Sequence, residues 1–357
     1  MYKSSFDSLK GFRFNFLALA IALFLILPIG LIAGDVTIAV TGDLFPKGGK
    51  YISDLILAQN PDAVLISGDT SNAGKTSVEI YRQTYKGTYD RFFEKIYPCP
   101  GNHDGYSEPP FSGYKEFWGD KAHAPEMYYS FDLGGWHIIS LNSEITKIDK
   151  QGLKKQAEWL KKDLAANPGK PIIAYWHRPF FSQSGKHGGT QGGTPYMKPI
   201  WEVLMANGPA LVFNGHNHIY EKYPPLDSEG KTVDESKGIQ SFGIGPGTGK
   251  GRKKVKNEKE EGTEAEGADD PEAGDVKAGK KVRKRLNNPP HPLMYDDEGP
   301  FVGFFTLQDD GGFKFVIKTI ENDGTAKTVD EGAGKLVMPS KPKVDSKQAS
   351  PEPSLLK

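Results

Sequence analysis

We predict a layered α/β domain for this 357-residue sequence, because short apolar runs alternate along it with amphipathic helical patterns. Polar residues of metal-binding type follow several of the runs directly, as expected where the strands of an α/β sheet end at a binding crevice. The length suits one large α/β domain or two ordinary ones. The net charge is zero, so any attraction for phosphate must come from a local site, and we expect no specific nucleic-acid binding.

Residues 1–34 are predicted to be a targeting segment, either a signal peptide or a signal anchor. Three basic residues precede an apolar stretch from Phe16 to Ala33, and residues 14–33 are long enough to anchor the chain in a bilayer. We favour cleavage near Ala33 or Gly34, because the strand pattern that starts at Val36 would leave an uncleaved anchor almost no tether. The prediction is an exported protein, whether periplasmic, secreted or luminal, that meets the membrane only through an uncleaved N-terminal segment.

Six runs of strand type follow one another, each apolar and bounded by turn residues. They span residues 36–40, 63–67, 172–176, 211–213, 301–307 and 313–317. Three helices are expected among them, because apolar residues recur there at helical spacing. Their buried faces are Ile52, Leu55 and Ile56; then Leu153, Ala157, Leu160 and Leu164; then Met197, Ile200, Trp201 and Leu204. Combinations of Asn, Pro and Gly follow each helix and end it.

A charged insertion interrupts the predicted domain, which we place at residues 35–325. From Lys250 to Arg285 the sequence holds no Leu, Ile, Met or aromatic residue. Such a stretch cannot bury enough apolar surface to offset its ordering entropy, so residues 249–287 are expected to be a disordered loop. Strand patterns resume after it, which makes it an insertion within one domain. Residues 326–357 are expected to be a largely disordered C-terminal tail.

The only cysteine, Cys99, excludes an intramolecular disulfide. It stands in the segment IYPCP, just before the GNHD turn at residues 101–104. We interpret Cys99 as a small buried residue that ends a strand, and not as a reactive or metal-binding thiol.

Six ligand-type side chains stand just past patterns of strand type: Asp43, Asp69, Asn102, His177, His216 and His218. Together they supply enough oxygen and nitrogen ligands for two divalent or trivalent metal ions, with Asp69 able to bridge them. Two metals side by side imply hydrolysis of phosphate esters. Asp35 competes as the first carboxylate, but we exclude it because it precedes its strand.

Five motifs in this order resemble those of the calcineurin-like metallophosphoesterases, most closely the purple acid phosphatase branch. They are GD at Asp43, GD at Asp69, GNHD at Asn102, YWHRP at His177, and GHNH at His216 and His218. The resemblance covers residues 36–320 apart from the insertion. It implies a four-layer α/β/β/α sandwich with two mixed β-sheets, the metallophosphoesterase fold, with the metals at the sheet ends and a small-molecule phosphate ester as substrate.

Carried over position by position, the resemblance assigns ligands to two metal ions. The first metal takes Asp43, Asp69 and His218, and the second takes Asp69, Asn102, His177 and His216. Asn102 suits its place because an amide oxygen ligates without adding charge.

The chain departs from the family pattern at Phe45 and Asn72. Family members usually carry a histidine at the first of these places or a tyrosine at the second. Phe45 cannot ligate, whereas the amide oxygen of Asn72 is an additional candidate ligand. Without a phenolate the ferric preference and purple colour are lost, so zinc, manganese or ferrous iron, or a weakly held first metal, is expected.

The implied mechanism uses a metal-bridging hydroxide as nucleophile on the phosphate. His103 resembles a family histidine that Asp104 places to orient the phosphate or protonate the leaving oxygen. His187 resembles another substrate-facing histidine. Because these two histidines resemble those of acid phosphatases, we predict a phosphomonoesterase. Two alternatives stay open: a phosphodiesterase on nucleotide or phospholipid-like esters, and a metal-depleted, non-catalytic phosphate-binding member.

Overall fold

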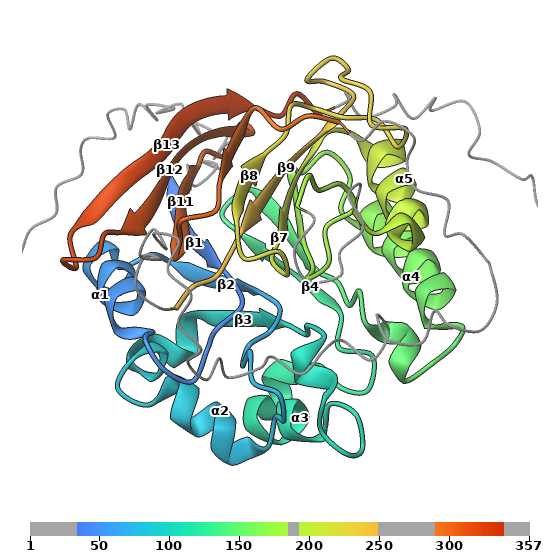
Figure 1. Cartoon of the computed structure of the whole chain (residues 1–357). Coiled ribbons are helices and arrows are strands. Elements are labelled where there is room, and N and C mark those ends of the chain that lie inside the picture. Colours follow the sequence, from blue (N-terminus) through green and yellow to red (C-terminus); the bar gives the residue numbers. More distant parts are fainter. Residues whose placement is uncertain (1–33, 185–192, 249–289, 339–357) are drawn as a thin grey trace, which may run out of the picture. The chain divides into compact units, whose positions relative to one another are not determined.

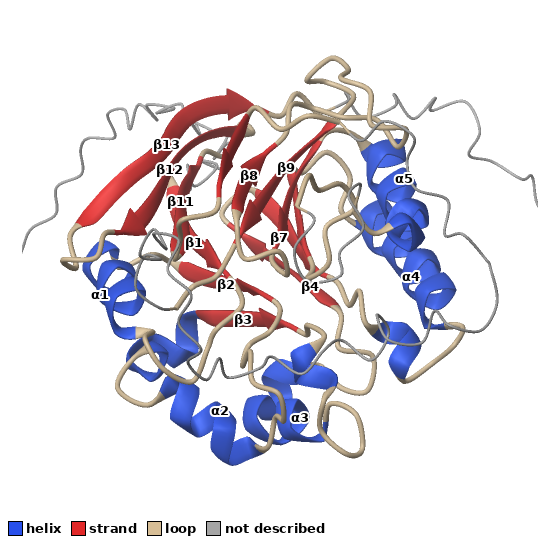
Figure 2. Ribbon diagram, in the orientation of Figure 1, coloured by secondary structure: helices blue, strands red, loops and turns tan. Residues whose placement is uncertain are grey.

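Two β-sheets pack face to face, and helices cover the outer face of each, in a computed structural model that describes residues 34–184, 193–248 and 290–338 (Figures 1 and 2). The first sheet has the strand order β13-β12-β11-β1-β2-β3 and the second β10-β8-β9-β7-β6-β5-β4. The predicted α/β/β/α sandwich is therefore confirmed.

The first sheet consists of β1 (Val36–Thr41), β2 (Ala63–Ser67), β3 (Ile96–Cys99), β11 (Phe301–Leu307), β12 (Gly312–Ile320) and β13 (Ala326–Lys335). The second consists of β4 (Tyr129–Leu133), β5 (Trp136–Ser140), β6 (Ile172–Tyr175), β7 (Ala210–Asn214), β8 (Tyr220–Lys222), β9 (Ile239–Ile244) and β10 (Met294–Asp296). Both sheets are mixed: β1, β2 and β3 run parallel beside antiparallel β11, and β5, β6, β7 and β9 run parallel beside antiparallel β4 and β8.

Five α-helices are described: α1 (Lys50–Gln59), α2 (Val78–Tyr85), α3 (Ser112–Trp118), α4 (Gly152–Ala166) and α5 (Lys198–Asn207). Short 3₁₀ helices are η1 (Tyr89–Lys95), η2 (His103–Gly105), η3 (Gly119–Ala122), η4 (Ile145–Lys147) and η5 (Pro195–Met197). The helices α1, α2 and α3 lie against the first sheet, whereas α4 and α5 lie against the second (Figure 2).

Alternate residues of each central strand face different cores. In β1, Ile38 and Val40 join the core between the sheets, whereas Ala39 joins the core beneath α1 and α2. In β6, Ile173 joins the core between the sheets, whereas Ile172 joins the core beneath α4 and α5. A parallel strand that is buried on both faces needs a continuous apolar run, and such runs allowed these strands to be predicted from the sequence.

Every strand predicted from the sequence falls on an observed strand, except that residue 176 lies just past β6. The three predicted helical faces lie on α1, α4 and α5, with Met197 just before α5. Cys99 is buried at the end of β3, as expected. Helices α2 and α3 were not predicted, because each has only two turns and its aromatic residues give no long apolar period.

The boundary placed at residue 325 was too early, since β13 lies in the segment we expected to be a disordered tail. It pairs antiparallel with β12, from Ala326 opposite Ile320 to Lys335 opposite Gly312. Most β13 side chains are exposed, so main-chain hydrogen bonds hold this edge strand where no apolar alternation marks it.

Two predicted segments, residues 249–287 and the targeting segment at 1–33, lie outside the described residues, as do residues 339–357. Among the helices that are described, none combines the length and the apolar character needed to cross a membrane.

Candidate metal centre

All six predicted ligands lie in loops at the carboxyl ends of parallel strands. Asp43, Asp69 and Asn102 follow β1, β2 and β3 of the first sheet. His177 follows β6, and the GHNH loop with its two histidines follows β7, both in the second sheet. The two sheets place these ends together, because the His177 imidazole lies against the backbone of Gly68, just past β2. Convergence of the six side chains is thus a property of the fold.

Four of the ligand candidates have a left-handed backbone. The φ angles are 55° at Asp43, 45° at Asp69, 74° at His216 and 52° at His218. Residues other than glycine avoid this region, at a cost of about 1–3 kcal/mol each. Such strain persists only where the surrounding structure enforces it, and it clusters at functional sites. Here the four left-handed residues all lie in the loops that follow β1, β2 and β7.

Two glycines let the backbone approach the buried carboxylates. A Cβ atom on Gly101 would lie 2.1 Å from the Asp69 nitrogen, and one on Gly245 would lie 2.2 Å from Asp43 Oδ2. No side chain fits at either position. The carboxylates are consequently enclosed by main chain, with Asp43 0% and Asp69 1% exposed.

One group of donor atoms forms around His177. Its Nε2 lies 2.9 Å from Asn102 Oδ1 and 3.2 Å from Asp69 Oδ2. Two donors bound to one metal at about 2.1 Å lie about 3.0–3.4 Å apart when the angle between them is about 90–110°. His177 Nδ1 donates to the Ser67 carbonyl at 3.1 Å, which leaves the Nε2 lone pair for a metal. These three side chains therefore fit one coordination sphere.

A second group forms around His218. Its Nε2 lies 3.4 Å from Asp43 Oδ1 and 2.8 Å from the Asn72 amide. Ligand atoms of Asp43, Asp69 and His177 all lie within 4.8 Å of one another, so the two groups of donors are adjacent. The Phe45 ring packs edge-on against His218 with centroids 5.4 Å apart and supplies no ligand atom.

The Asp69 carboxylate is held ionised by neighbouring imidazoles. Burial raises the pKa of Asp69, but His177 and then His103 outweigh it and bring the pKa well below its usual range. Burial lowers the pKa of His177, but Asp69 outweighs it and raises that pKa to about 9. A buried carboxylate neutralised by an imidazolium is a charge arrangement that a metal ion can replace, because His177 would bind the metal as a neutral imidazole.

His216 contacts a ligand candidate of each group, Asp43 and His177. Its backbone nitrogen donates to both oxygens of Asp43, at 3.1 and 3.0 Å. Its ring lies edge-on to His177, with centroids 5.0 Å apart. The imidazole therefore lies beside the His177 group, to which the resemblance assigns it.

Asp104 supports the loops beneath the site and does not touch the His103 imidazole. Its buried carboxylate accepts hydrogen bonds from Gly101, Tyr81 and the Thr70 backbone and hydroxyl, at 2.6–3.1 Å. His103 Nδ1 instead donates to the Ala73 carbonyl at 2.8 Å. We expected Asp104 to place His103, and it acts on that residue only through the backbone of the turn.

Three charged residues that the sequence did not single out border the His177 side of the site. Arg178 Nη1 donates to His216 Nε2 at 3.1 Å, and Arg178 Nε donates to Glu144 Oε1 at 2.6 Å. Lys147 lies 3.4 Å from the second oxygen of Glu144. The only sequence signal was the place of Arg178 beside His177 in the YWHRP motif. His187, the other predicted substrate-facing residue, lies outside the described residues.

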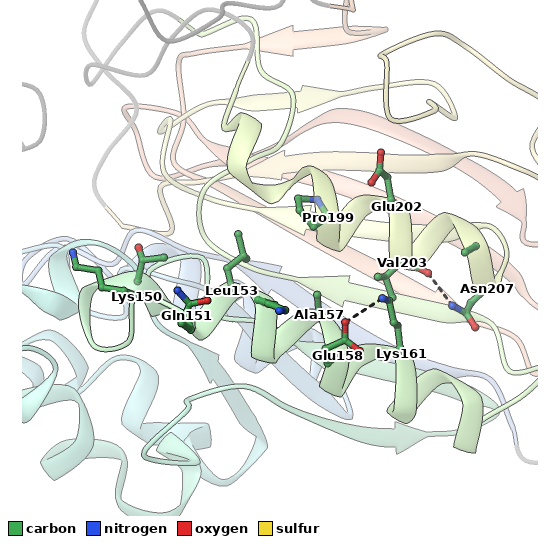
Figure 3. Close-up of a pocket in the computed structure, with 13 residues that line it drawn as sticks. Lys150, Gln151, Leu153, Ala157, Glu158, Lys161, Pro199, Glu202, Val203 and Asn207 are labelled. Atoms are coloured by element: carbon green, nitrogen blue, oxygen red, sulfur yellow. Dashed lines mark hydrogen bonds and ion pairs between the residues drawn. The ribbon is translucent and has the colours of Figure 1, made fainter. Parts of the chain in front are cut away.

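A groove of about 760 Å³ lies between α4 and α5 (Figure 3). Leu153, Ala157 and Val203 contribute to its lining, together with lysine and glutamate side chains of the two helices. None of the candidate ligands lines it. The groove is a separate feature of the second sheet's helical layer.

Known proteins resemble this chain in sequence. Residues 36–220 match the sequence model of the calcineurin-like phosphoesterase family. The chain is 32% identical over 225 residues to purple acid phosphatase 15 of Arabidopsis thaliana, with 52% of this chain and 40% of that protein covered. It is 29% identical over 223 residues to human (Homo sapiens) acid phosphatase type 7, with 53% of this chain and 48% of that protein covered. The chain thus spans less than half the length of these two relatives.

A solved structure shares the fold. A purple acid phosphatase isolated from yellow lupin (Lupinus luteus) seeds superimposes with a TM-score of 0.54 at 15% identity, covering 85% of this chain and 54% of the lupin chain. At this identity the likeness concerns the fold alone.

Proposed function

This chain belongs to the calcineurin-like phosphoesterase family, and on that premise we propose that it is a binuclear metal-dependent phosphomonoesterase of the acid phosphatase type. The observation that carries the proposal is the spacing of donor atoms around His177 and His218, which suits two neighbouring cations. The relatives named purple acid phosphatase and acid phosphatase support the choice of substrate class.

The metal ligands follow from the two groups of donors. Asp69, Asn102, His177 and His216 would hold the second metal. Asp43, Asp69 and His218 would hold the first. Iron, zinc and manganese all accept this mixture of carboxylate, amide and imidazole.

Asn72 is proposed as an additional ligand of the first metal. Its amide nitrogen lies 2.8 Å from His218 Nε2, and rotation of the amide by half a turn exchanges nitrogen and oxygen at that place. The amide adds no negative charge, so the first metal would be held more weakly than a phenolate holds it.

Bound metals would supply an activated water as nucleophile and neutralise the phosphoryl oxygens. The chain's own groups perform the remaining work. The His103 backbone nitrogen donates to Asp69 Oδ1 at 2.8 Å, which fixes the orientation of the Asp69 carboxylate. Because its Nδ1 is held by a carbonyl, His103 offers Nε2 to the substrate, where it can orient the phosphate or protonate the leaving oxygen. His187 is proposed to act beside it.

The chain is also proposed to be exported. This rests on the basic and apolar pattern of its first 34 residues, which is typical of export signals, with residues 14–33 as a membrane anchor if the signal is not cleaved.

Metal analysis combined with two assays tests the proposed function. The full chain, loaded with manganese, zinc or iron, is expected to bind two metals and to hydrolyse p-nitrophenyl phosphate faster than bis-p-nitrophenyl phosphate. Asp69→Ala and Asn102→Ala are expected to lose metal and activity together. Faster diester hydrolysis would favour the phosphodiesterase, and a chain that binds phosphate without hydrolysing either ester would be a non-catalytic member. Unchanged activity in Asp69→Ala would rule out the assigned centre.

A further inference from the structure

A basic residue with no assigned role borders the candidate metal centre. Two ligand candidates of this centre are buried, with Asn102 3% and His177 0% exposed. The Arg178 side chain, one residue on, is 12% exposed. The Arg178 side chain therefore reaches closer to the solvent than these two ligand candidates do.

The Arg178 guanidinium is held in one orientation. Its Nε donates to Glu144 Oε1 at 2.6 Å, and its backbone nitrogen donates to Ser143 Oγ at 3.2 Å. Ser143 and Glu144, both in the loop after β5, thus hold the backbone and the side chain of Arg178. The Nη1 atom is directed to His216 Nε2, 3.1 Å away. A planar guanidinium fixed in this way is prepared to bind an oxyanion.

Glu144 is the common partner of two cationic side chains. Glu144 is 3% exposed and touches both Arg178 Nε, at 2.6 Å, and Lys147 Nζ, at 3.4 Å. Burial raises the pKa of Glu144, but Arg178 and then Lys147 outweigh it and lower that pKa, so the group is ionised. Glu144 thus holds two cationic side chains beside the candidate ligands, since Arg178 contacts His216 and Lys147 Nζ lies 3.4 Å from the Asn102 carbonyl oxygen. Cationic groups held at this place favour the binding of an anion.

We propose that Arg178, positioned by Glu144, binds a non-bridging oxygen of the substrate phosphate and favours phosphomonoesters over diesters. The inference rests on the proposed function. A phosphomonoester dianion carries more charge on its non-bridging oxygens than a diester monoanion, so a fixed cation stabilises it more strongly. Arg178 is then a substrate-binding residue and Glu144 a positioning residue.

Binding of inorganic phosphate to the manganese-loaded full chain, measured by titration calorimetry, tests the proposal without requiring turnover. Arg178→Gln is expected to weaken phosphate binding by about tenfold to a hundredfold, the loss of one charge-assisted hydrogen bond, with an unchanged metal content. Arg178→Lys is expected to recover part of the affinity, because it keeps the charge and loses the planar fork. Glu144→Gln is expected to weaken phosphate binding less than Arg178→Gln does. The matched control is Arg91→Gln, which removes a partly buried arginine paired with Asp54 beside α1.

Kinetics add the specificity readout. Arg178→Gln is expected to lower kcat/KM for p-nitrophenyl phosphate more than for bis-p-nitrophenyl phosphate, mainly through KM. Phosphate affinity within twofold of the wild type, or equal losses for the two esters, would overturn the proposal. So would loss of metal in Arg178→Lys, because the residue would then serve to support His216. A wild-type chain that hydrolyses neither ester refutes the proposed function, while the phosphate affinities of the variants still decide the role of Arg178.

Discussion

Substitution of Gly101 tests whether main-chain packing encloses the metal centre. A Cβ at this position would lie 2.1 Å from the Asp69 nitrogen and 2.2 Å from Asp69 Oδ1, whereas ordinary contacts begin near 3.4 Å. The shortfall is about 1.3 Å against backbone, which cannot rotate away. Overpacking of a buried position costs about 1–3 kcal/mol, and more where backbone must move. We expect Gly101→Ala to lower the free energy of unfolding by about 3 kcal/mol and to displace Asp69 from both proposed metal sites.

The matched control is Gly74→Ala, where a Cβ meets nothing within 4 Å. Urea denaturation gives the free energies of unfolding, and elemental analysis of the folded proteins gives the metal content per chain. Gly74→Ala is expected to match the wild type in both. If Gly101→Ala retained two metals and the wild-type urea midpoint, the close approach of Gly101 to Asp69 would not exist and the enclosure argument would fail.

Three further predictions concern the first metal, the support of the site and a distant ion pair. Phe45→His adds an imidazole beside His218 and is expected to tighten binding of the first metal, measured by competition with a chelator; unchanged affinity would show that residue 45 does not face it. Tyr81→Phe removes a 2.6 Å hydrogen bond to buried Asp104 and is expected to cost about 1–3 kcal/mol in urea denaturation, whereas a cost near zero would contradict the network. His137 is wedged between two carboxylates, at 2.8 and 2.7 Å; burial lowers its pKa, but hydrogen bonds to the carboxylates outweigh it and raise the pKa above 6.5. Protonated His137 therefore contributes fully to the free energy of unfolding below pH 6.5, and this contribution is lost as the pH rises through the raised pKa. The difference in free energy of unfolding between the wild type and His137→Gln should accordingly shrink above pH 6.5. A difference that is independent of pH would refute this assignment.

Much of the fold could be predicted from the sequence because the central strands are buried on both faces. Short apolar runs bounded by turn residues, such as Ala63–Ser67, are typical of strands buried on both faces, and this pattern can be read from neighbouring residues alone. The candidate ligands could be predicted for a related reason, because each follows a strand pattern within a few residues. Strand β13 escaped prediction because an edge strand is specified by its partner's hydrogen bonds and not by its own apolar pattern.

Local sequence thus accounts for which side chains stand at the strand ends, but not for how those ends meet. The contacts of the site join residues far apart: Asp43 accepts from His216 across 173 positions, and His177 meets Asn102 across 75. The distances arise from the packing of one sheet on the other and from left-handed turns that only this packing enforces. The hydrogen bond between Arg178 and Glu144 has the same origin, because it forms only where the loops after β5 and β6 lie side by side in the assembled second sheet.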